Sequence, residues 1–172
     1  MISYILAVVC GVLFLAADQY TKYFVSTNFE LGESREFLNG FIDLIYIHNK
    51  GGAWGILQGH TWGLLAISVV LMIICLALLL KLGKSNKLVF WSVTLIMFGG
   101  IGNLIDRIFR DGNVVDFLHF EFYPQFPVFN IADCAVVIGA GLLLLYFIYD
   151  CINDSKAKRA KYLSQVQNNE DN

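Results

Sequence analysis

Four apolar stretches, each about as long as a bilayer is thick, constrain this chain more than any other feature. They cover residues 2–25, 62–82, 88–105 and 131–149. The hydrocarbon core of a bilayer is about 30 Å thick, and a helix needs roughly 20 apolar residues to cross it. The composition agrees, because 57% of the 172 residues are hydrophobic, only 15% are charged and the mean hydropathy is +0.62. We therefore predict an integral membrane protein, mainly α-helical, with four transmembrane helices.

The net charge and the cysteines argue against several classes of function. The formal net charge is -2 at pH 7, so the chain lacks the basic excess of proteins that bind nucleic acid. We do not expect nucleic acid as a partner. Four cysteines are widely spaced, lie in or beside apolar runs and form no CxxC pair: Cys10, Cys75, Cys134 and Cys151. We interpret them as small hydrophobic residues rather than disulfide partners or catalytic thiols.

Basic residues in two short segments set the predicted orientation. Three lysines lie in the turn between the second and third stretches, and four basic residues follow the fourth stretch: Lys81, Lys84, Lys87, Lys156, Lys158, Arg159 and Lys161. The positive-inside rule puts both segments in the cytoplasm, and an even number of spans brings the N-terminus there too. The longer connections, residues 26–61 and 106–130, then lie on the outer side.

The chain is predicted to form one transmembrane domain over residues 1–152, followed by a polar cytoplasmic tail over residues 153–172. The tail is rich in Lys, Asn and Gln, so we expect a frayed helix end or disorder there. Within the first outer connection, residues 41–48 (FIDLIYIH) alternate in part and include β-branched and aromatic residues. This pattern predicts a short strand or hairpin.

Ionisable and amide side chains lie at the outer ends of the predicted spans, where they are energetically expensive. Asp116 stands in the connection between the last two spans. The others form three groups whose members are three or four residues apart and so share a helix face: Asp18 with Lys22; Asn103 with Asp106 and Arg107; and Asn130 with Asp133. Because all of these residues come to one membrane face, we predict a functional site at the outer surface.

Each group also has a purely structural interpretation, which the sequence leaves open. Asp18 and Lys22 would then be an i,i+4 ion pair whose lysine extends to the membrane surface. Asn130 would be a helix N-cap, and Asp133 would be favoured in the first turn by the helix dipole. Asp106 and Arg107 would only mark the membrane interface.

Other chemistries have weaker support. The three histidines, His48, His60 and His119, form no ligand pair at metal-binding spacing, although His119 follows Asp116 closely enough to leave a metal site open. The serines lack a partnered histidine or a GxSxG motif, which argues against a serine hydrolase. The glycine-rich residues 99–102 (GGIG) favour close helix packing over a phosphate-binding loop.

Five short motifs follow one another along the chain. They are DQYTK (residues 18–22), HNKGGAWG (48–55), GNLIDR (102–107), VVDF (114–117) and FPVFNIAD (126–133). In type and order they resemble the motifs of lipoprotein signal peptidases, the type II signal peptidases of bacteria. Two positions depart from that pattern: Gly52, where the family more often has Ala, and Cys134, where it often has Ser.

The resemblance implies four transmembrane helices with a small extracellular β-sheet, in the bacterial cytoplasmic membrane. It implies an aspartyl endopeptidase that removes the signal peptide from a lipid-modified precursor, just before the diacylglyceryl cysteine. Prolipoproteins and membrane lipids would be its partners, and we expect a monomer. Asp116 and Asp133 would be the catalytic pair. The other polar positions of the family, which would shape the pocket or hold substrate, fall on Asp18, Lys22, Asn49, Asn103, Asp106, Arg107 and Asn130.

The loop over residues 49–55 has adjacent glycines, including Gly51, beside the aromatic Trp54. Glycines allow a loop to move, and tryptophan favours the headgroup level of a bilayer. We expect this loop to help cover bound substrate, and the alternative is that Trp54 only anchors the loop at the interface.

Peptide hydrolysis by two carboxylates needs one ionised group to take a proton from water and one protonated group to polarise the scissile carbonyl. Two carboxylates in one site cannot both ionise easily, so the titration belongs to the pair. We expect no cofactor and no metal, since a carboxylate activates the water. The alternative from another class is a small transport subunit in which Asp18, Asp106 and Asp133 line a proton or cation path. The almost wholly apolar residues 62–80 argue against that path.

Overall fold

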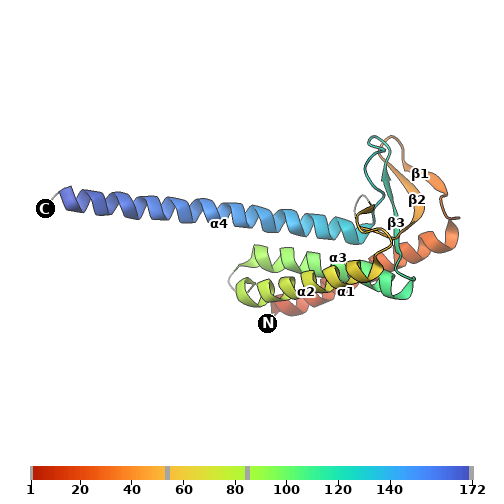
Figure 1. Ribbon diagram of the computed structural model, residues 1–172, viewed down its shortest axis with the longest axis horizontal. Coiled ribbons are helices and arrows are strands. Elements are labelled where there is room, and N and C mark those ends of the chain that lie inside the picture. The colour runs from red at the N-terminus through yellow and green to blue at the C-terminus, as the bar shows by residue number, and fades with distance from the viewer. Residues whose placement is uncertain (1, 53–54, 84–85, 171–172) are drawn as a thin grey trace.

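A computed structural model describes residues 2–52, 55–83 and 86–170, and within them it contains four long helices. These are α1 (Ile2–Asn28), α2 (Thr61–Leu82), α3 (Lys87–Phe109) and α4 (Ile131–Glu170). Each is long and apolar enough to cross a membrane, which confirms the four predicted spans. The first and third helices run about a turn further than the predicted apolar stretches, and the added turn of α3 contains Asp106 and Arg107. Figure 1 shows α1, α2, α3 and the first half of α4 as one bundle.

The three strands form one antiparallel sheet at one end of this bundle (Figure 1). They are β1 (Ser34–Leu38), β2 (Ile42–Asn49) and β3 (Val114–Phe120), in the order β1-β2-β3. The strand predicted over residues 41–48 is β2, paired with β1 in a hairpin whose turn holds Gly40 at a φ of 74°. Glycine adopts this left-handed conformation without steric cost, which permits the tight turn. The N-terminus lies at the end of the bundle away from the sheet, and the C-terminus lies further out in the same direction.

Glycines bring α3 and α4 into close contact. A Cβ atom added at Gly99 would lie 2.5 Å from the Ala132 carbonyl oxygen, and one added at Gly139 would lie 2.6 Å from the Ser92 carbonyl oxygen. Neither distance is tolerable, so only glycine lets the two backbones approach this far. The interpretation of residues 99–102 as a helix-packing segment is confirmed at Gly99.

The buried core consists of two clusters, one between the sheet and the helices and one among the helices alone. Near the sheet, Val25 and Phe29 at the end of α1 pack against Val115 and Phe117 of β3 and against Tyr46 of β2. At the other end of the bundle, a second cluster joins α2 to α3. The first cluster fixes the sheet onto the ends of the helices, and it therefore positions any residue carried by β3.

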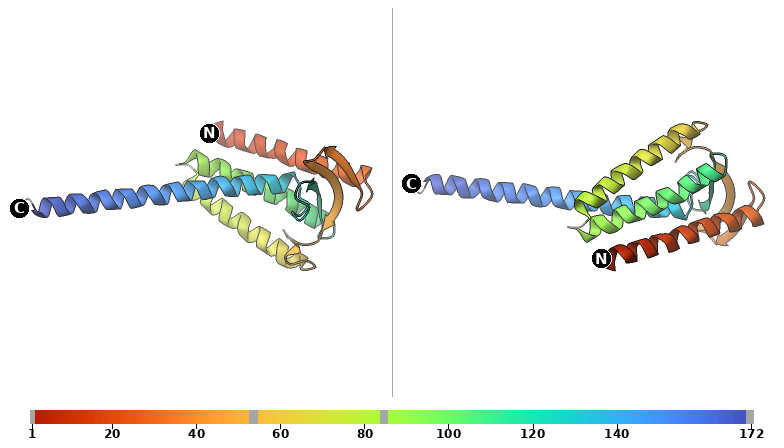
Figure 2. Two further views of the ribbon diagram at one scale, coloured as in Figure 1. Left: turned by 90° about the horizontal axis from the view of Figure 1, so that it is seen from above. Right: turned by 90° about the horizontal axis from the view of Figure 1, so that it is seen from below.

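The second half of α4 differs from the expectation for the tail. Residues 153–172 were expected to fray or be disordered, but α4 continues as a helix to Glu170. Figure 2 shows this part of α4 extending well beyond the other helices in both views. The segment contains no Gly or Pro after Gly141, and an i,i+4 ion pair joins Asp154 to Lys158 at 2.6 Å. Both features favour continuation of a helix that is already nucleated inside the bundle.

Candidate functional site

Polar residues from five elements converge where the sheet meets the helices. Asp116 lies on β3, directly above the start of α4, which carries Asp133 in its first turn. Around them lie almost all of the side chains predicted for the site: Asp18 and Lys22 on α1; Asn103, Asp106 and Arg107 on α3; Asn49 at the end of β2; and Asn130 just before α4. Trp54 lies outside the described residues. The structure thus brings together groups that are more than 100 residues apart in the sequence.

Asp116 is held through both of its carboxylate oxygens. Asn49 Nδ2 donates to Oδ2 at 2.8 Å, and Asn130 Nδ2 donates to Oδ1 at 2.6 Å. The side chain is 1% exposed, so these two amides replace the water that would otherwise solvate the carboxylate. Asp116 therefore has a fixed orientation toward the start of α4.

Asp133 is held by a second pair of donors. Asn103 Nδ2 donates to Oδ1 at 2.7 Å, and the backbone N–H of Asn130 donates to Oδ2 at 3.1 Å. In return, Asn130 Oδ1 accepts from the backbone N–H of Asp133 at 3.0 Å, which makes a reciprocal capping box at the start of α4. The structural interpretation of Asn130 as an N-cap is thus correct, but its amide nitrogen also reaches Asp116. One asparagine contacts both carboxylates.

A buried ionic layer lies beneath the two carboxylates. Lys22 Nζ is 3.0 Å from Asp18 Oδ2 and 3.3 Å from Asp106 Oδ2, and it donates to Asn103 Oδ1 at 2.9 Å. Asp18, Lys22 and Asp106 are all fully buried. The lysine does not extend to the surface, because two carboxylates and an amide oxygen compensate its charge inside the protein.

The two aspartates of this layer also bind the backbone of the neighbouring elements. Asp18 Oδ1 accepts from the backbone N–H of Ala132 at 3.0 Å, in the first turn of α4. Asp106 Oδ2 accepts from the backbone N–H of Val115 at 3.0 Å, one residue before Asp116. The ionic layer therefore sets the positions of both elements that carry the paired carboxylates.

Gln19 is a site residue that the sequence analysis missed. Its Nε2 lies 3.1 Å from Asp18 Oδ2, 3.1 Å from the Gly102 carbonyl oxygen and 3.2 Å from Asp106 Oδ1. It joins α1 to α3 beside the ionic layer. An uncharged polar residue within an apolar span was the available signal, since such a residue needs a partner inside the protein.

Arg107 links the site to the loop after β2. Its Nη2 donates to the Gly51 carbonyl oxygen at 3.2 Å, while the Gly51 N–H donates to Asn49 Oδ1 at 2.8 Å. A Cβ atom added at Gly51 would lie 3.1 Å from the carbonyl oxygen of Ile56, so the described part of this loop folds tightly on itself. Through Asn49 the loop is connected to Asp116.

The environment of Asp116 suits acid–base chemistry near neutrality. Burial, and to a smaller extent the nearby charge of Asp133, raise its pKa to about 7, although the hydrogen bonds from Asn49 and Asn130 oppose the rise. A carboxyl group with this pKa is partly protonated at neutral pH and can donate or accept a proton.

Among the described residues, no group of three His, Cys, Asp or Glu side chains is arranged to hold a metal ion.

The chain is similar to members of one protein family over most of its length. Residues 10–149 match the family model described as signal peptidase (SPase) II. The lipoprotein signal peptidase of Halalkalibacterium halodurans is 41% identical over 162 residues, which cover 94% of this chain and 99% of the relative. The lipoprotein signal peptidase of Enterococcus faecalis is 38% identical over 151 residues, covering 87% of this chain and 89% of the relative.

Two solved structures have the same fold. A bacterial membrane enzyme determined by the in meso method at 2.3 Å resolution superposes with a TM-score of 0.79 and 31% identity, covering 86% of this chain and 90% of that one. A second bacterial membrane enzyme, determined at 1.9 Å, gives a TM-score of 0.76 and 32% identity, covering 84% and 93%. With a family model that spans the whole bundle and relatives that match over most of their length, this chain belongs to the signal peptidase II family.

Proposed function

We propose that Asp116 and Asp133 form the catalytic pair of an endopeptidase that removes the signal peptide from diacylglyceryl-modified prolipoproteins, immediately before the lipidated cysteine. The observation that carries this proposal is the shared ligand Asn130, which donates to Asp116 Oδ1 at 2.6 Å and to Asp133 Oδ2 at 3.1 Å. One residue in contact with both carboxylates keeps them facing a common space. The family membership supplies the substrate class.

In the proposed reaction, one carboxylate removes a proton from a water molecule as the water oxygen bonds to the scissile carbonyl carbon. The other carboxyl group gives its proton to the carbonyl oxygen. The C–N bond of the resulting tetrahedral intermediate then breaks, and the proton taken from water passes to the leaving nitrogen. One hydroxyl of the intermediate returns its proton to the carboxylate that had acted as the acid, so the pair again holds one proton. The products are the carboxyl end of the signal peptide and the free amino group of the lipidated cysteine. The pKa of about 7 for Asp116 supports a single proton shared by the pair at neutral pH.

The surrounding residues have separate roles in this proposal. Asn49, Asn103 and Asn130 orient the two carboxylates through the hydrogen bonds described above. The ionic layer of Asp18, Lys22 and Asp106 holds β3 and α4 in place. Gly51 and Trp54 belong to the loop that we propose covers bound substrate. Arg107 of α3 would hold this loop through its hydrogen bond to the Gly51 carbonyl oxygen.

We further propose that both ends of the chain lie in the cytoplasm, that the site faces the outer surface and that the enzyme acts as a monomer surrounded by lipid. The basic residues beside the turn after α2 and along the end of α4 lie away from the sheet, as this orientation requires. A cysteine placed at Glu33 should react with a maleimide that cannot cross the membrane, while a cysteine placed at Lys87 should not. The opposite labelling pattern would contradict the orientation.

A transport path is less well supported by the arrangement of buried charges. Among the residues that the structure describes, the fully buried ionisable side chains are Asp18, Lys22, Asp106 and Asp116, all near the sheet. The buried polar side chains further along α3 are Ser92 and Thr94, whose hydroxyls donate to backbone carbonyls of the same helix. A proton or cation path would need groups that continue across the bundle.

The direct test uses purified protein in lipid vesicles with a diacylglyceryl-modified precursor and, as control, the same precursor without the lipid. We expect cleavage of the lipidated form only, no effect of chelators, and loss of cleavage in both Asp116→Asn and Asp133→Asn. The Asn side chain keeps the size of Asp but cannot exchange a proton at working pH. Cleavage by either folded variant, or zinc-dependent recovery after EDTA treatment, would contradict the proposed mechanism.

A further inference from the structure

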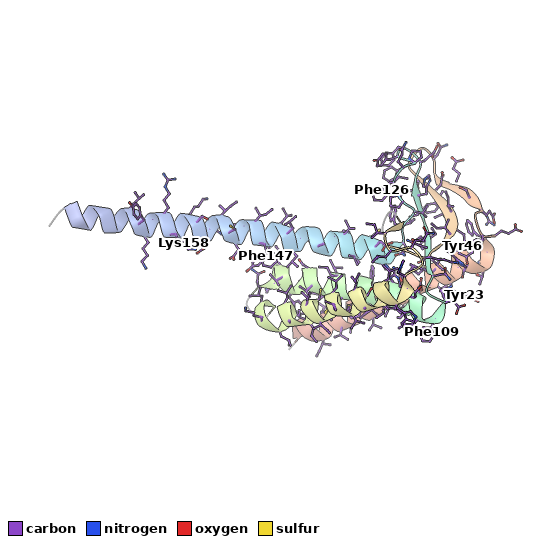
Figure 3. All side chains as sticks on the ribbon, viewed as in Figure 1. Tyr23, Tyr46, Phe109, Phe126, Phe147 and Lys158 are labelled. Carbon is purple, nitrogen blue, oxygen red and sulfur yellow. The ribbon has the colours of Figure 1, made fainter. Side chains whose placement is uncertain are left out.

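The far end of the sheet carries an exposed aromatic cluster that the catalytic proposal does not use. We call it the aromatic tip, and it consists of residues from the β1–β2 turn, the end of β3 and the loop before α4: Phe41, Phe120, Phe122, Tyr123, Phe126 and Phe129. Phe41 and Phe122 stack with ring centroids 5.4 Å apart. Figure 3 shows the side chains crowded at this end of the sheet, where Phe126 is labelled.

The aromatic tip is too exposed to be explained as a core of the sheet. Phe122 is 61% exposed, Tyr123 is 51% exposed and Phe41 is 49% exposed. Contiguous apolar surface of this kind, ordered by ring contacts yet open to the surroundings, is typical of an interaction site rather than of scattered surface residues. Some other material therefore covers these rings.

The strand register shows which way the cluster faces. Leu44 of β2 lies opposite Leu118 of β3, and both pack against the core cluster at the ends of the helices. Two residues further along, Ile42 lies opposite Phe120. Because every second residue of a strand points to the same face, Phe120 shares its face with Leu118 and with Asp116, whose carboxylate accepts a hydrogen bond from Asn130 just before α4.

The other face of the same strands carries polar side chains. Glu36 of β1 lies opposite Asp43 of β2, which lies opposite His119 of β3. These three residues form a row across the sheet, next to the apolar row of Leu38, Ile42 and Phe120. At the tip the sheet is thus amphipathic, with the apolar row on one face and the polar row on the other. Nearer the helices the second face is apolar too, because Val115 and Phe117 pack there against the end of α1.

The tip extends sideways past the bundle, so no helix lies under it. In Figure 1 the ends of the strands lie beyond α4, on the side away from the other three helices. On α4, Val137 and Ile138 are 70% and 56% exposed, as expected for a helix surface that faces acyl chains. Figure 1 shows the sheet at the level along the bundle where α4 begins.

We infer that the aromatic tip inserts into the headgroup region of the leaflet that surrounds the start of α4, so that the bilayer itself covers the exposed rings. Aromatic side chains favour this depth, where an apolar ring contacts acyl chains and its polar edges stay hydrated. The insertion holds the sheet flat against the membrane beside the bundle. The inference does not depend on the chemistry of Asp116 and Asp133 or on which side of the membrane the sheet occupies.

The test places one nitroxide label on each face of the sheet, in protein reconstituted into phosphatidylcholine–phosphatidylglycerol vesicles. The four native cysteines, Cys10, Cys75, Cys134 and Cys151, are first replaced by Ala or Ser. Phe122→Cys then puts the label in the aromatic tip, and Glu36→Cys puts it on the polar face as the matched control. Collision rates are measured with oxygen, which partitions into lipid, and with a nickel chelate that stays in water.

We expect the label at position 122 to lose most of its nickel collisions and gain oxygen collisions relative to the label at position 36. Equal nickel collision rates at the two positions would overturn the inference. Protection of position 122 that appears only after a lipidated precursor is added would also overturn it, because the tip would then bind substrate instead of lipid. The same pair of labels in the Asp116→Asn background should give the same result, which separates this inference from the catalytic proposal.

Thermal unfolding curves check that the labels at positions 122 and 36 leave the fold unchanged. Both labelled positions are exposed, so each protein should unfold at the same temperature as its cysteine-free parent. As a second variant, Phe122→Ser with Phe41→Ser should restore nickel access to a label at Tyr123→Cys. Unchanged protection of that label would mean that the two phenylalanines do not hold the tip in the bilayer, and it would contradict the inference.

Discussion

Two aspartate–lysine pairs with the same helical spacing occupy opposite ends of the molecule. Asp18 and Lys22 are 3.0 Å apart on α1 and fully buried, whereas Asp154 and Lys158 are 2.6 Å apart on α4 with 60% and 78% of their side chains exposed. The shorter pair is the weaker one, because water screens its charges and its side chains lose entropy when they pair. The buried pair has no water to replace a lost partner. Burial and the identity of the partners, rather than distance, decide what each pair does.

The comparison extends to the whole of α4. Its first turn holds Asp133 through partners from α3 and from the residue before the helix, and a network of three other elements surrounds it. Its last turns carry Lys, Arg, Asn and Gln side chains whose described members are exposed to the surroundings. The same helix is therefore part of the proposed catalytic site at one end and a polar extension at the other.

The largest effect is expected at the paired carboxylates. Asp116→Asn, Asp133→Asn and the double variant should each lower kcat by roughly 10⁴-fold or more, and the double variant should be little worse than either single one, as for residues that act as a unit. Cleavage of a lipidated precursor measures kcat, and circular dichroism checks the fold. If the two losses multiplied in the double variant, the residues would act independently and the proposed pair would be wrong.

The buried ionic layer should give the next largest effect. Lys22→Met removes the cation between Asp18 and Asp106, so two carboxylates stay buried without it. We expect a loss of about 3–5 kcal/mol in the free energy of unfolding, the usual cost of breaking a buried ion pair from one side. Thermal unfolding in detergent measures it.

A companion variant keeps this prediction testable if Lys22→Met folds poorly. Adding Asp106→Asn to Lys22→Met removes one of the unpaired carboxylates and should recover part of the lost stability. The two residues would not be energetically coupled if Asp106→Asn lowered the free energy of unfolding as much in the Lys22→Met background as it does in the unmodified protein.

The pH dependence of cleavage should follow the protonation of Asp116. Its raised pKa of about 7 means that the proton is present below that pH and is lost above it, so cleavage should fall on the alkaline side of neutrality. The hydrogen bond from Asn49 lowers this pKa, and Asn49→Ala should therefore move the alkaline fall to higher pH. Initial rates across a pH series measure the position of the fall.

Asn113 offers a matched control for that experiment. Its side chain donates to the Arg110 carbonyl oxygen at 2.8 Å and has no hydrogen bond to Asp116 in the structure. Asn113→Ala should leave the alkaline fall where it is in the unmodified enzyme. A shift of equal size in both variants would mean that the change comes from general loosening and not from the contact with Asp116.

The spans and most of the site could be predicted because each has a local signal. Apolar runs predict the helices. Ionisable residues at the ends of those runs cost free energy in a membrane, so their presence at one membrane face indicates a common functional site. Residue spacing could not show that Asn130 is both a cap and a ligand of Asp116, because the second contact depends on how β3 lies over α4. The family resemblance, and not the spacing, singled out Asp116 and Asp133.

The features that were missed depend on tertiary contacts. The strand β3 was not predicted from its residue pattern, because seven residues rich in apolar side chains show little alternation, and it is fixed instead by pairing with β2 and by Asp106. Gln19 carries no charge, and two of its partners, the Gly102 carbonyl oxygen and Asp106, lie on α3. The composition of the last residues of α4 left a frayed helix end and disorder both open. Its structure is a helix, because continuation from a helix already formed in the bundle costs little.

The smallest effect is expected for the exposed pair at the end of α4, and it is the matched control for Lys22→Met. Lys158→Met makes the same change of residue at the same i,i+4 spacing from an aspartate, but Asp154 stays in water after its partner is lost. Exposed pairs of this kind contribute little, so the unfolding temperature and the cleavage rate should both match those of the unmodified protein within experimental error. Thermal unfolding and cleavage assays run beside those of Lys22→Met provide the measurement. A loss of stability as large as that of Lys22→Met would show that the end of α4 packs against something in the membrane or in a second molecule, and the contrast between the two ends of the protein would then be wrong.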